Sequence, residues 1–152
     1  MSYIGNLRKY VGHSPIISVG STVLVFNDKN ELLLNLRSDS NDWGIPGGGK
    51  EINETLEECA IRELKEETNL DVSDLELVTV LSGKEYFYVY PNLDEVDCVI
   101  TLYQVKNYTG NLSINDGESK RLEFFSLDNL PILEKRAKRI IDKIKDGTIK
   151  LK

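Results

Sequence analysis

The sequence predicts a mixed β-sheet flanked by helices, in the α/β or α+β class. Two observations carry this prediction: short β-branched segments alternate with turn formers, and two segments, one central and one C-terminal, place apolar residues at helical spacing. The chain of 152 residues has the usual length of one domain. We therefore expect a single domain over residues 1–152, long enough to bury an ordinary hydrophobic core.

The first predicted elements are two strands and a loop. Residues 16–26 are apolar and β-branched, residues 27–30 are turn formers, and an apolar run resumes over residues 31–36. This pattern predicts a β-hairpin. Residues 39–50 contain four glycines and a proline, which is typical of a loop.

A helix is predicted over residues 55–68. Thr55 and Glu58 fit a capping box, in which each side chain bonds the backbone N–H of the other residue. Asn69 is a suitable C-terminal cap because asparagine tolerates the left-handed conformation.

The C-terminal half is expected to supply further strands and a last helix. Strands are predicted over residues 75–82, 85–90, 96–105 and 122–126. A helix should begin at residue 127 or 128 and end at Asp146, before Gly147. Its apolar stripe would contain Ile132, Leu133, Ala137, Ile140, Ile141 and Ile144.

The net charge of −6, from 19 basic and 25 acidic residues, disfavours a protein that grips long nucleic acids through a basic surface. Two-thirds of the acidic excess lies in residues 48–70, where three cations face seven carboxylates. The acidic excess is therefore concentrated in one segment, and its explanation should lie in the function of that segment.

Two cysteines, Cys59 and Cys98, do not form a disulfide framework and are expected to be small packing residues. The sequence has no signal-like apolar N-terminus and no membrane-length apolar run. We expect a cytoplasmic protein without a membrane partner.

Three carboxylates of the predicted helix, Glu63, Glu66 and Glu67, share a sector of about 100° on a helical wheel. Glu67 falls inside the apolar stripe, where a charge is costly unless it is paired or binds a cation. Clustered carboxylates suit Mg²⁺ or Mn²⁺. A solvated acidic face is the alternative; it explains Glu57 and Glu58 well but Glu67 poorly.

The glycine loop before this helix offers backbone N–H groups and close approach to a ligand, at Gly47 and Gly48 above all. The segment from Gly44 to Lys50 also matches the first seven positions of a P-loop. The eighth position is Glu51 in place of Ser or Thr, and Pro46 lacks a backbone donor. These two departures exclude the P-loop interpretation.

From Gly48 to Leu70 the chain reads G-x5-E-x7-R-E-L-x-E-E-x-N-L. This segment resembles the Nudix box, G-x5-E-x7-R-E-U-x-E-E-x-G-U with U an aliphatic residue, and departs from it where Asn69 replaces glycine. The flanks resemble the family less specifically: Trp43 to Gly48 before the box, and residues 118–131 as the last strand and following helix.

The resemblance implies an α/β/α sandwich that hydrolyses a nucleoside diphosphate linked to another group X, with Mg²⁺ or Mn²⁺ held by Glu63, Glu66 and Glu67. The general base would be Glu66 or Glu63, with Glu118 as a candidate outside the box. Arg62 would orient the glutamates.

Two residues outside the box are expected to contact substrate. Arg37 resembles a basic residue often found at that strand end and would meet a phosphate. Tyr86, in an aromatic run of residues 86–90, would stack on a nucleobase; the alternative is an ordinary strand with one face in the core.

Three other interpretations stay open: a housecleaning enzyme for oxidised nucleoside triphosphates, a nucleotide-binding sensor without catalysis, and an acidic interaction domain. The sequence does not identify X or the oligomeric state, and a homodimer is one option.

Overall fold

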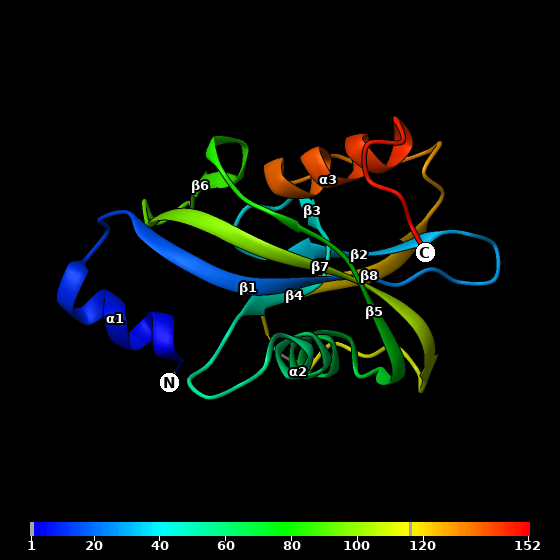
Figure 1. Cartoon of the computed structure of the whole chain (residues 1–152), viewed down its shortest axis with the longest axis horizontal. Helices are drawn as coiled ribbons and strands as arrows, with labels where there is room; N and C mark the ends of the chain where they lie inside the picture. Colours follow the sequence, from blue (N-terminus) through cyan, green and yellow to red (C-terminus); the bar gives the residue numbers. More distant parts are fainter. Residues whose placement is uncertain (1, 116) are drawn as a thin grey trace.

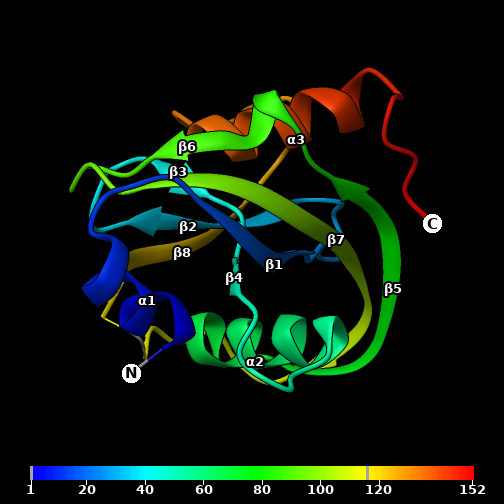
Figure 2. The same cartoon turned by 60° about the vertical axis from the view of Figure 1, so that its left-hand side comes forward.

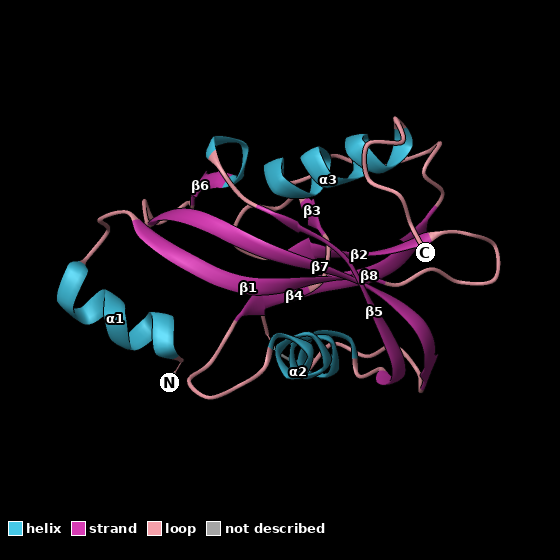
Figure 3. Cartoon of the chain, in the orientation of Figure 1, coloured by secondary structure: helices cyan, strands magenta, loops and turns pink. Residues whose placement is uncertain are grey.

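The computed structural model describes residues 2–115 and 117–152. Its elements, in chain order, are α1 (Tyr3–Val11), β1 (Ile16–Leu24), β2 (Leu32–Arg37), β3 (Trp43–Gly44), β4 (Gly47–Gly49), α2 (Leu56–Thr68), β5 (Asp71–Leu81), the 3₁₀ turn η1 (Lys84–Tyr86), β6 (Phe87–Val89), β7 (Glu95–Thr109), β8 (Ser119–Phe125) and α3 (Lys135–Lys145). Figure 1 shows α2 and α3 on opposite sides of the strands, and Figure 3 shows the same three layers by element type.

The strands form two sheets. The five-stranded sheet has the order β4-β1-β7-β5, with β6 also paired to β7, and it is mixed because β1 and β7 run parallel. The three-stranded sheet has the order β3-β2-β8. The predicted mixed sheet between helices is therefore confirmed, with a second, antiparallel sheet beside it.

The predicted hairpin over residues 16–36 is wrong beyond its turn. Asn27 and Glu31 close the turn, and Phe26 pairs with Leu32, but β1 then pairs with β7 and β4 while β2 joins the other sheet. The reason is burial: Leu32, Leu33 and Leu34 are all fully buried, so both faces of β2 need a core.

One core lies on the α3 side of the sheets and a second lies under α2. The first contains Leu32, Leu34 and Leu102, and the second contains Leu33 and Leu64. Alternate residues of β2 thus enter opposite cores, which fixes its register strongly. No helix in the described part of the chain is long and apolar enough to cross a membrane.

The central helix follows its prediction closely. The Thr55–Glu58 capping box is present, and Asn69 caps the C-terminus in the left-handed conformation with a φ of 69°. Both features depend on residues within one turn of the helix end, which is why the sequence alone determines them.

The last helix begins later than predicted, at Lys135, because Glu134 accepts a hydrogen bond from the Ala137 N–H and acts as its N-cap. Pro131, just upstream, restricts the residue before it to extended conformations. Ile132 consequently lies outside the helix and is 82% exposed.

Three short elements went unpredicted. Helix α1 contains no buried residue; Ser2 caps it and Gly12 ends it. Strands β3 and β4 lie inside the predicted loop of residues 39–50.

Candidate active site

Arg62 of α2 is the centre of a carboxylate network. Its Nη2 donates to Glu54 Oε1 at 2.9 Å and to the Gly49 carbonyl at 3.0 Å. Its Nη1 lies 2.9 Å from Glu63 Oε1 and 3.3 Å from Glu66 Oε2. The hydrogen bond from Arg62 lowers the pKa of Glu54 to about 2. One guanidinium thus ties the helix to the glycine loop and orients two of the three predicted metal ligands.

The glycine loop contacts two of the three predicted metal ligands, Glu67 and Glu63. Glu67 is 7% exposed, as its place in the apolar stripe predicted, and its Oε2 accepts the Gly47 N–H at 2.9 Å. A Cβ on Gly48 would lie only 2.3 Å from the carboxyl carbon of Glu63. Because Gly48 has no side chain, the Glu63 carboxylate can occupy the space where a Cβ of residue 48 would otherwise lie.

The electrostatics around Glu63 favour a cation. Burial, and then the negative charges of Glu66 and Glu118, raise the pKa of Glu63, although Arg62 acts in the opposite direction. Oxygen donors in an acidic, partly buried setting are the ligands that Mg²⁺ or Mn²⁺ takes. Among the described residues, however, no three carboxylate, histidine or cysteine groups already form a metal-ligand set. The donor chemistry fits such an ion, and the present side-chain positions do not yet converge on one point.

A cavity of about 1000 Å³ opens in front of this face of α2. Glu118 lines it together with Glu63, Glu66 and Glu67. The residues described in its lining include seven carboxylates and three arginines. A compact polyanion can therefore enter this cavity only where the arginines or a bound cation offset the negative charge of the carboxylates.

Arg37, at the end of β2, also lines this cavity. Its Nη2 forms an ion pair with Asp39 at 2.9 Å, and its guanidinium lies 5.8 Å from the centroid of the Tyr90 ring. Burial would lower the pKa of Arg37, but the hydrogen bond and charge of Asp39 raise it above its usual value. Arg37 is thus a fixed, permanently charged group at the cavity wall.

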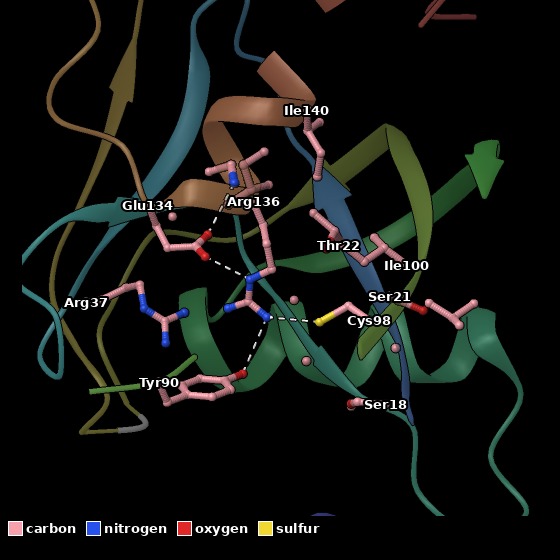
Figure 4. A pocket seen from close by; sticks show the side chains of 18 residues that line it. Ser18, Ser21, Thr22, Arg37, Tyr90, Cys98, Ile100, Glu134, Arg136 and Ile140 are labelled. Carbon is pink, nitrogen blue, oxygen red and sulfur yellow. Dashed lines mark hydrogen bonds and ion pairs between the residues drawn. The ribbon is translucent and has the colours of Figure 1, made fainter. Parts of the chain in front are cut away.

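A smaller cavity of about 130 Å³ adjoins the first, under α3 (Figure 4). Arg136 spans it: the Nε bonds Glu134 at 2.8 Å, and Nη1 lies 3.5 Å from the Tyr90 hydroxyl and 3.4 Å from the Cys98 sulfur. The guanidinium also stacks 4.1 Å from the centroid of the Tyr88 ring. These contacts make a rigid, polar pocket bordered by an aromatic ring.

The structure brings most of the predicted site residues to the larger cavity. They are Arg37, Gly47, Gly48, Arg62, Glu63, Glu66, Glu67 and Glu118. The Gly47 N–H is already donated to Glu67, and a Cβ on Gly47 would lie 2.3 Å from the backbone oxygen of Ser21, so the missing side chain of Gly47 makes room for β1.

Tyr86 is the exception, and its prediction as a substrate-contacting ring is corrected. The residue lies in η1, not in a strand, is 1% exposed and packs in the core. Gly83 precedes this turn with a φ of 100°, and the turn directs Tyr86 inward. Tyr90 borders both cavities instead.

The sequence signal for Tyr90 was present, since period-two alternation puts residues 86, 88 and 90 in one set. Glu134 and Arg136 had no such signal: an ion pair at the start of a basic helix looks like a surface feature. His13 is exposed, and its Nδ1 lies 2.7 Å from Asp94 Oδ1. Cys59 and Cys98 are buried free thiols, as predicted.

Comparisons with known proteins agree with this architecture. The NUDIX domain model matches residues 17–145. The chain is 32% identical over 140 residues to "ADP-ribose pyrophosphatase" of Methanocaldococcus jannaschii, covering 90% of this chain and 77% of that protein. It is 31% identical over 130 residues to "Putative 8-oxo-dGTP diphosphatase" of Bacillus subtilis (strain 168), covering 84% and 80%.

Among solved structures, the NUDIX domain of Shewanella oneidensis NrtR complexed with ADP ribose superposes with a TM-score of 0.69 at 18% identity. The match covers 97% of this chain and 99% of that one. At this level of identity the likeness concerns the fold.

Proposed function

Because the chain belongs to the Nudix hydrolase family and is a pyrophosphohydrolase, we propose that it catalyses the Mg²⁺-dependent hydrolysis of a pyrophosphate bond in a small nucleotide. The substrate is a nucleoside diphosphate linked to a group X, or a nucleoside triphosphate. Water attacks one phosphorus atom, the bridging oxygen leaves with the other phosphoryl group, and two phosphorylated products result.

The observation that carries the proposal is the set of three glutamates on one wall of the larger cavity. Glu63, Glu66 and Glu67 would hold Mg²⁺ or Mn²⁺, and the ion would neutralise the pyrophosphate and the charge that develops at phosphorus. Arg62 keeps two of these carboxylates in place through the contacts described above. The Gly47 N–H holds the third.

The proton of the attacking water requires an acceptor near this wall. Glu66 or Glu63 is the first candidate, because both line the cavity; burial raises the pKa of Glu63, which favours its taking up a proton. Glu118 is the candidate outside the helix. It lines the same cavity as Glu63, and its negative charge is one of the causes that raise the pKa of Glu63.

The nucleotide would lie across both cavities. Arg37 and Gly48 line the larger cavity and would face the phosphates. The nucleobase would enter the smaller cavity beside Tyr90, whose ring offers a stacking surface.

The acidic lining of the larger cavity supports a small nucleotide, rather than a long nucleic acid, as the partner. The two buried free thiols fit the expected cytoplasmic location.

The test is a substrate panel with ³¹P NMR detection of products. ADP-ribose, ATP, GDP-mannose, GTP and 8-oxo-dGTP are each incubated with the protein in Mg²⁺, and again after addition of EDTA. We expect turnover of at least one compound that EDTA abolishes and fresh Mg²⁺ restores.

Two outcomes contradict the proposal. Turnover that survives EDTA removes the metal from the mechanism. Tight binding of a nucleotide without turnover of any compound identifies the chain as a nucleotide-binding sensor instead.

A further inference from the structure

The smaller cavity lies under α3, next to Tyr90, which follows β6. Figures 1 and 2 both show α3 and β6 on the side of the sheets opposite α2. The aliphatic lining of the cavity comprises Ile45, Val99, Ile100, Ala137 and Ile140. Its lining also includes three charged residues, Arg37, Glu134 and Arg136. Aliphatic contacts with a few fixed polar groups suit a flat heterocycle, whose faces are apolar and whose edge is polar.

Arg136 is held in this cavity from two sides. Its Nε donates to Glu134 at 2.8 Å, and its guanidinium lies 4.1 Å from the centroid of the Tyr88 ring in β6. Both partners are themselves buried, because the Glu134 side chain is 5% exposed and Tyr88 is 8% exposed. The Glu134 carboxylate also accepts the Ala137 N–H at 3.2 Å. These contacts fix the plane of the Arg136 guanidinium.

One edge of this guanidinium makes no hydrogen bond within the described part of the chain. Nε donates to Glu134, and Nη1 lies near the Tyr90 hydroxyl and the Cys98 sulfur. No described residue accepts a hydrogen bond from Nη2, which carries two N–H donors. Figure 4 shows the guanidinium directed from α3 into the space between Arg37 and Tyr90. Arg136 thus offers the cavity a fixed donor edge.

The charges of both arginines in this cavity are balanced by carboxylates of the chain. Arg136 is paired with Glu134, and Arg37 donates to Asp39 through Nε at 3.1 Å and Nη2 at 2.9 Å. A phosphate in the smaller cavity would therefore exchange its water for aliphatic side chains and for cations that are already paired, which is costly. A neutral carbonyl oxygen carries no net charge, and a single donor satisfies it. The cavity thus fits the carbonyl edge of a neutral ring.

We infer that Arg136 determines which nucleobase the protein accepts. It selects a ring that carries a carbonyl oxygen, as hypoxanthine and uracil do, over a ring that carries an amino group at that position, as adenine and cytosine do. Nη2 donates to the carbonyl oxygen, as arginine does when it recognises guanine in nucleic acids. An amino group would instead place its N–H donors against those of Nη2. Because the base must lie in this cavity, the inference rests on the proposed function.

The experiment measures dissociation constants of nucleoside monophosphates by calorimetry in the presence of Mg²⁺. Two matched pairs are used, IMP with AMP and UMP with CMP. The members of each pair differ only by a carbonyl and a ring N–H in place of an amino group and a ring nitrogen. A monophosphate contains no pyrophosphate bond, so binding is measured without turnover. In the pair that binds better, the wild type should bind the carbonyl member about tenfold or more tightly.

Two variants remove the donor edge and keep a partner for residue 134. Glu134→Gln combined with Arg136→Gln replaces the ion pair by two amides, so that no buried charge is left unpaired. An amide can turn either its oxygen or its nitrogen to the ring, so the members of a pair should then bind within about twofold of each other. In Arg136→Lys the ammonium still pairs with Glu134 but presents no planar edge to the ring, and the preference should fall about threefold or more.

Arg139→Gln is the matched control, since Arg139 belongs to the same helix and is exposed. Its preference between the members of each pair should equal that of the wild type. Melting temperatures are measured for all variants, because Glu134 caps α3. If the double variant unfolds, Arg136→Lys decides the comparison.

The inference is overturned if the wild type binds none of the four monophosphates, binds the members of both pairs equally, or prefers the amino members. It is also overturned if the folded variants keep the wild-type preference, even where they weaken the binding of both members, because Arg136 then acts on the phosphate or on the fold alone. A wild type that shows the tenfold preference but turns over no compound of the nucleotide panel refutes the proposed function and leaves the role of Arg136 in place.

Discussion

Replacing Gly48 with alanine tests whether the position of the Glu63 carboxylate controls the reaction. The new Cβ would lie 2.3 Å from the carboxyl carbon of Glu63 and 2.4 Å from its Oε1. Ordinary contacts between such atoms are about 3.5 Å, so the carboxylate must move by about 1 Å. The atoms in conflict are the far end of a flexible side chain, so the fold can accommodate the change while the site cannot.

A misplacement of about 1 Å in a catalytic group can cost about 100-fold in rate, which corresponds to about 2.7 kcal/mol of barrier. We therefore expect Gly48→Ala to lower kcat about 100-fold. The melting temperature should stay close to that of the wild type. The assay is steady-state kinetics on whichever compound of the panel is turned over best, with thermal unfolding measured on the same preparation.

Two neighbouring glycines supply the controls. At Gly49 the added Cβ meets only Ile4, at 3.7 Å, so Gly49→Ala should keep both activity and stability. At Gly47 the added Cβ would lie 2.3 Å from the backbone oxygen of Ser21, so Gly47→Ala should lower the free energy of unfolding by about 2 kcal/mol. Full activity in Gly48→Ala, or loss of activity only through unfolding, would refute the reasoning.

Three more predictions concern single residues of the same segment. Glu67→Gln should lower kcat about tenfold or more, with an unchanged melting temperature because the amide oxygen still accepts the Gly47 N–H; wild-type kcat would remove Glu67 from the metal site. Since the folded pKa of Glu54 is about 2, below the ordinary 4.5, its ion pair stabilises the fold above pH 4.5 and is lost as the pH falls toward 2. Urea unfolding should show this as a stability loss of about 1–2 kcal/mol after solvent screening, and the loss should be absent in Glu54→Gln. Asn69→Ala should cost about 1 kcal/mol and Asn69→Gly about 0.5 kcal/mol or less, because position 69 is left-handed; equal denaturation midpoints for the two variants would argue against this cap.

The sequence and the structure agree best where interactions are local. The helix over residues 56–68, its capping box and its left-handed end depend on groups within one turn, and the helical wheel places Glu67 among apolar residues. Arg62 and Glu66 are one turn apart, so their ion pair also follows from spacing. For the same reason the spacing of the three glutamates is enough to assign them to one face of the helix.

Agreement fails where a contact joins distant segments. We expected strand β2 to pair with β1. Three consecutive leucines of β2 are buried and pack in two cores, and β2 pairs with the strands of the other sheet instead. Tyr86 and Tyr90 belong to one alternating run, and a 3₁₀ turn decides that Tyr90 reaches the cavities while Tyr86 is buried. The periodicity of apolar residues shows which side chains share one face of a strand or helix, but it does not show which other elements pack against that face.

The sequence by itself therefore determined the class of fold, the acidic helix and the placing of its glutamates on one face, because a 23-residue segment carries them through short-range geometry. Only the tertiary structure placed Arg37, Tyr90 and Glu118 around that helix. It alone brought α1 to the same cavity, through contacts such as Arg8 with Glu95 that span most of the chain. Long-range pairing is set by the burial of whole faces and by backbone hydrogen bonding, and neither quantity can be read from neighbouring residues.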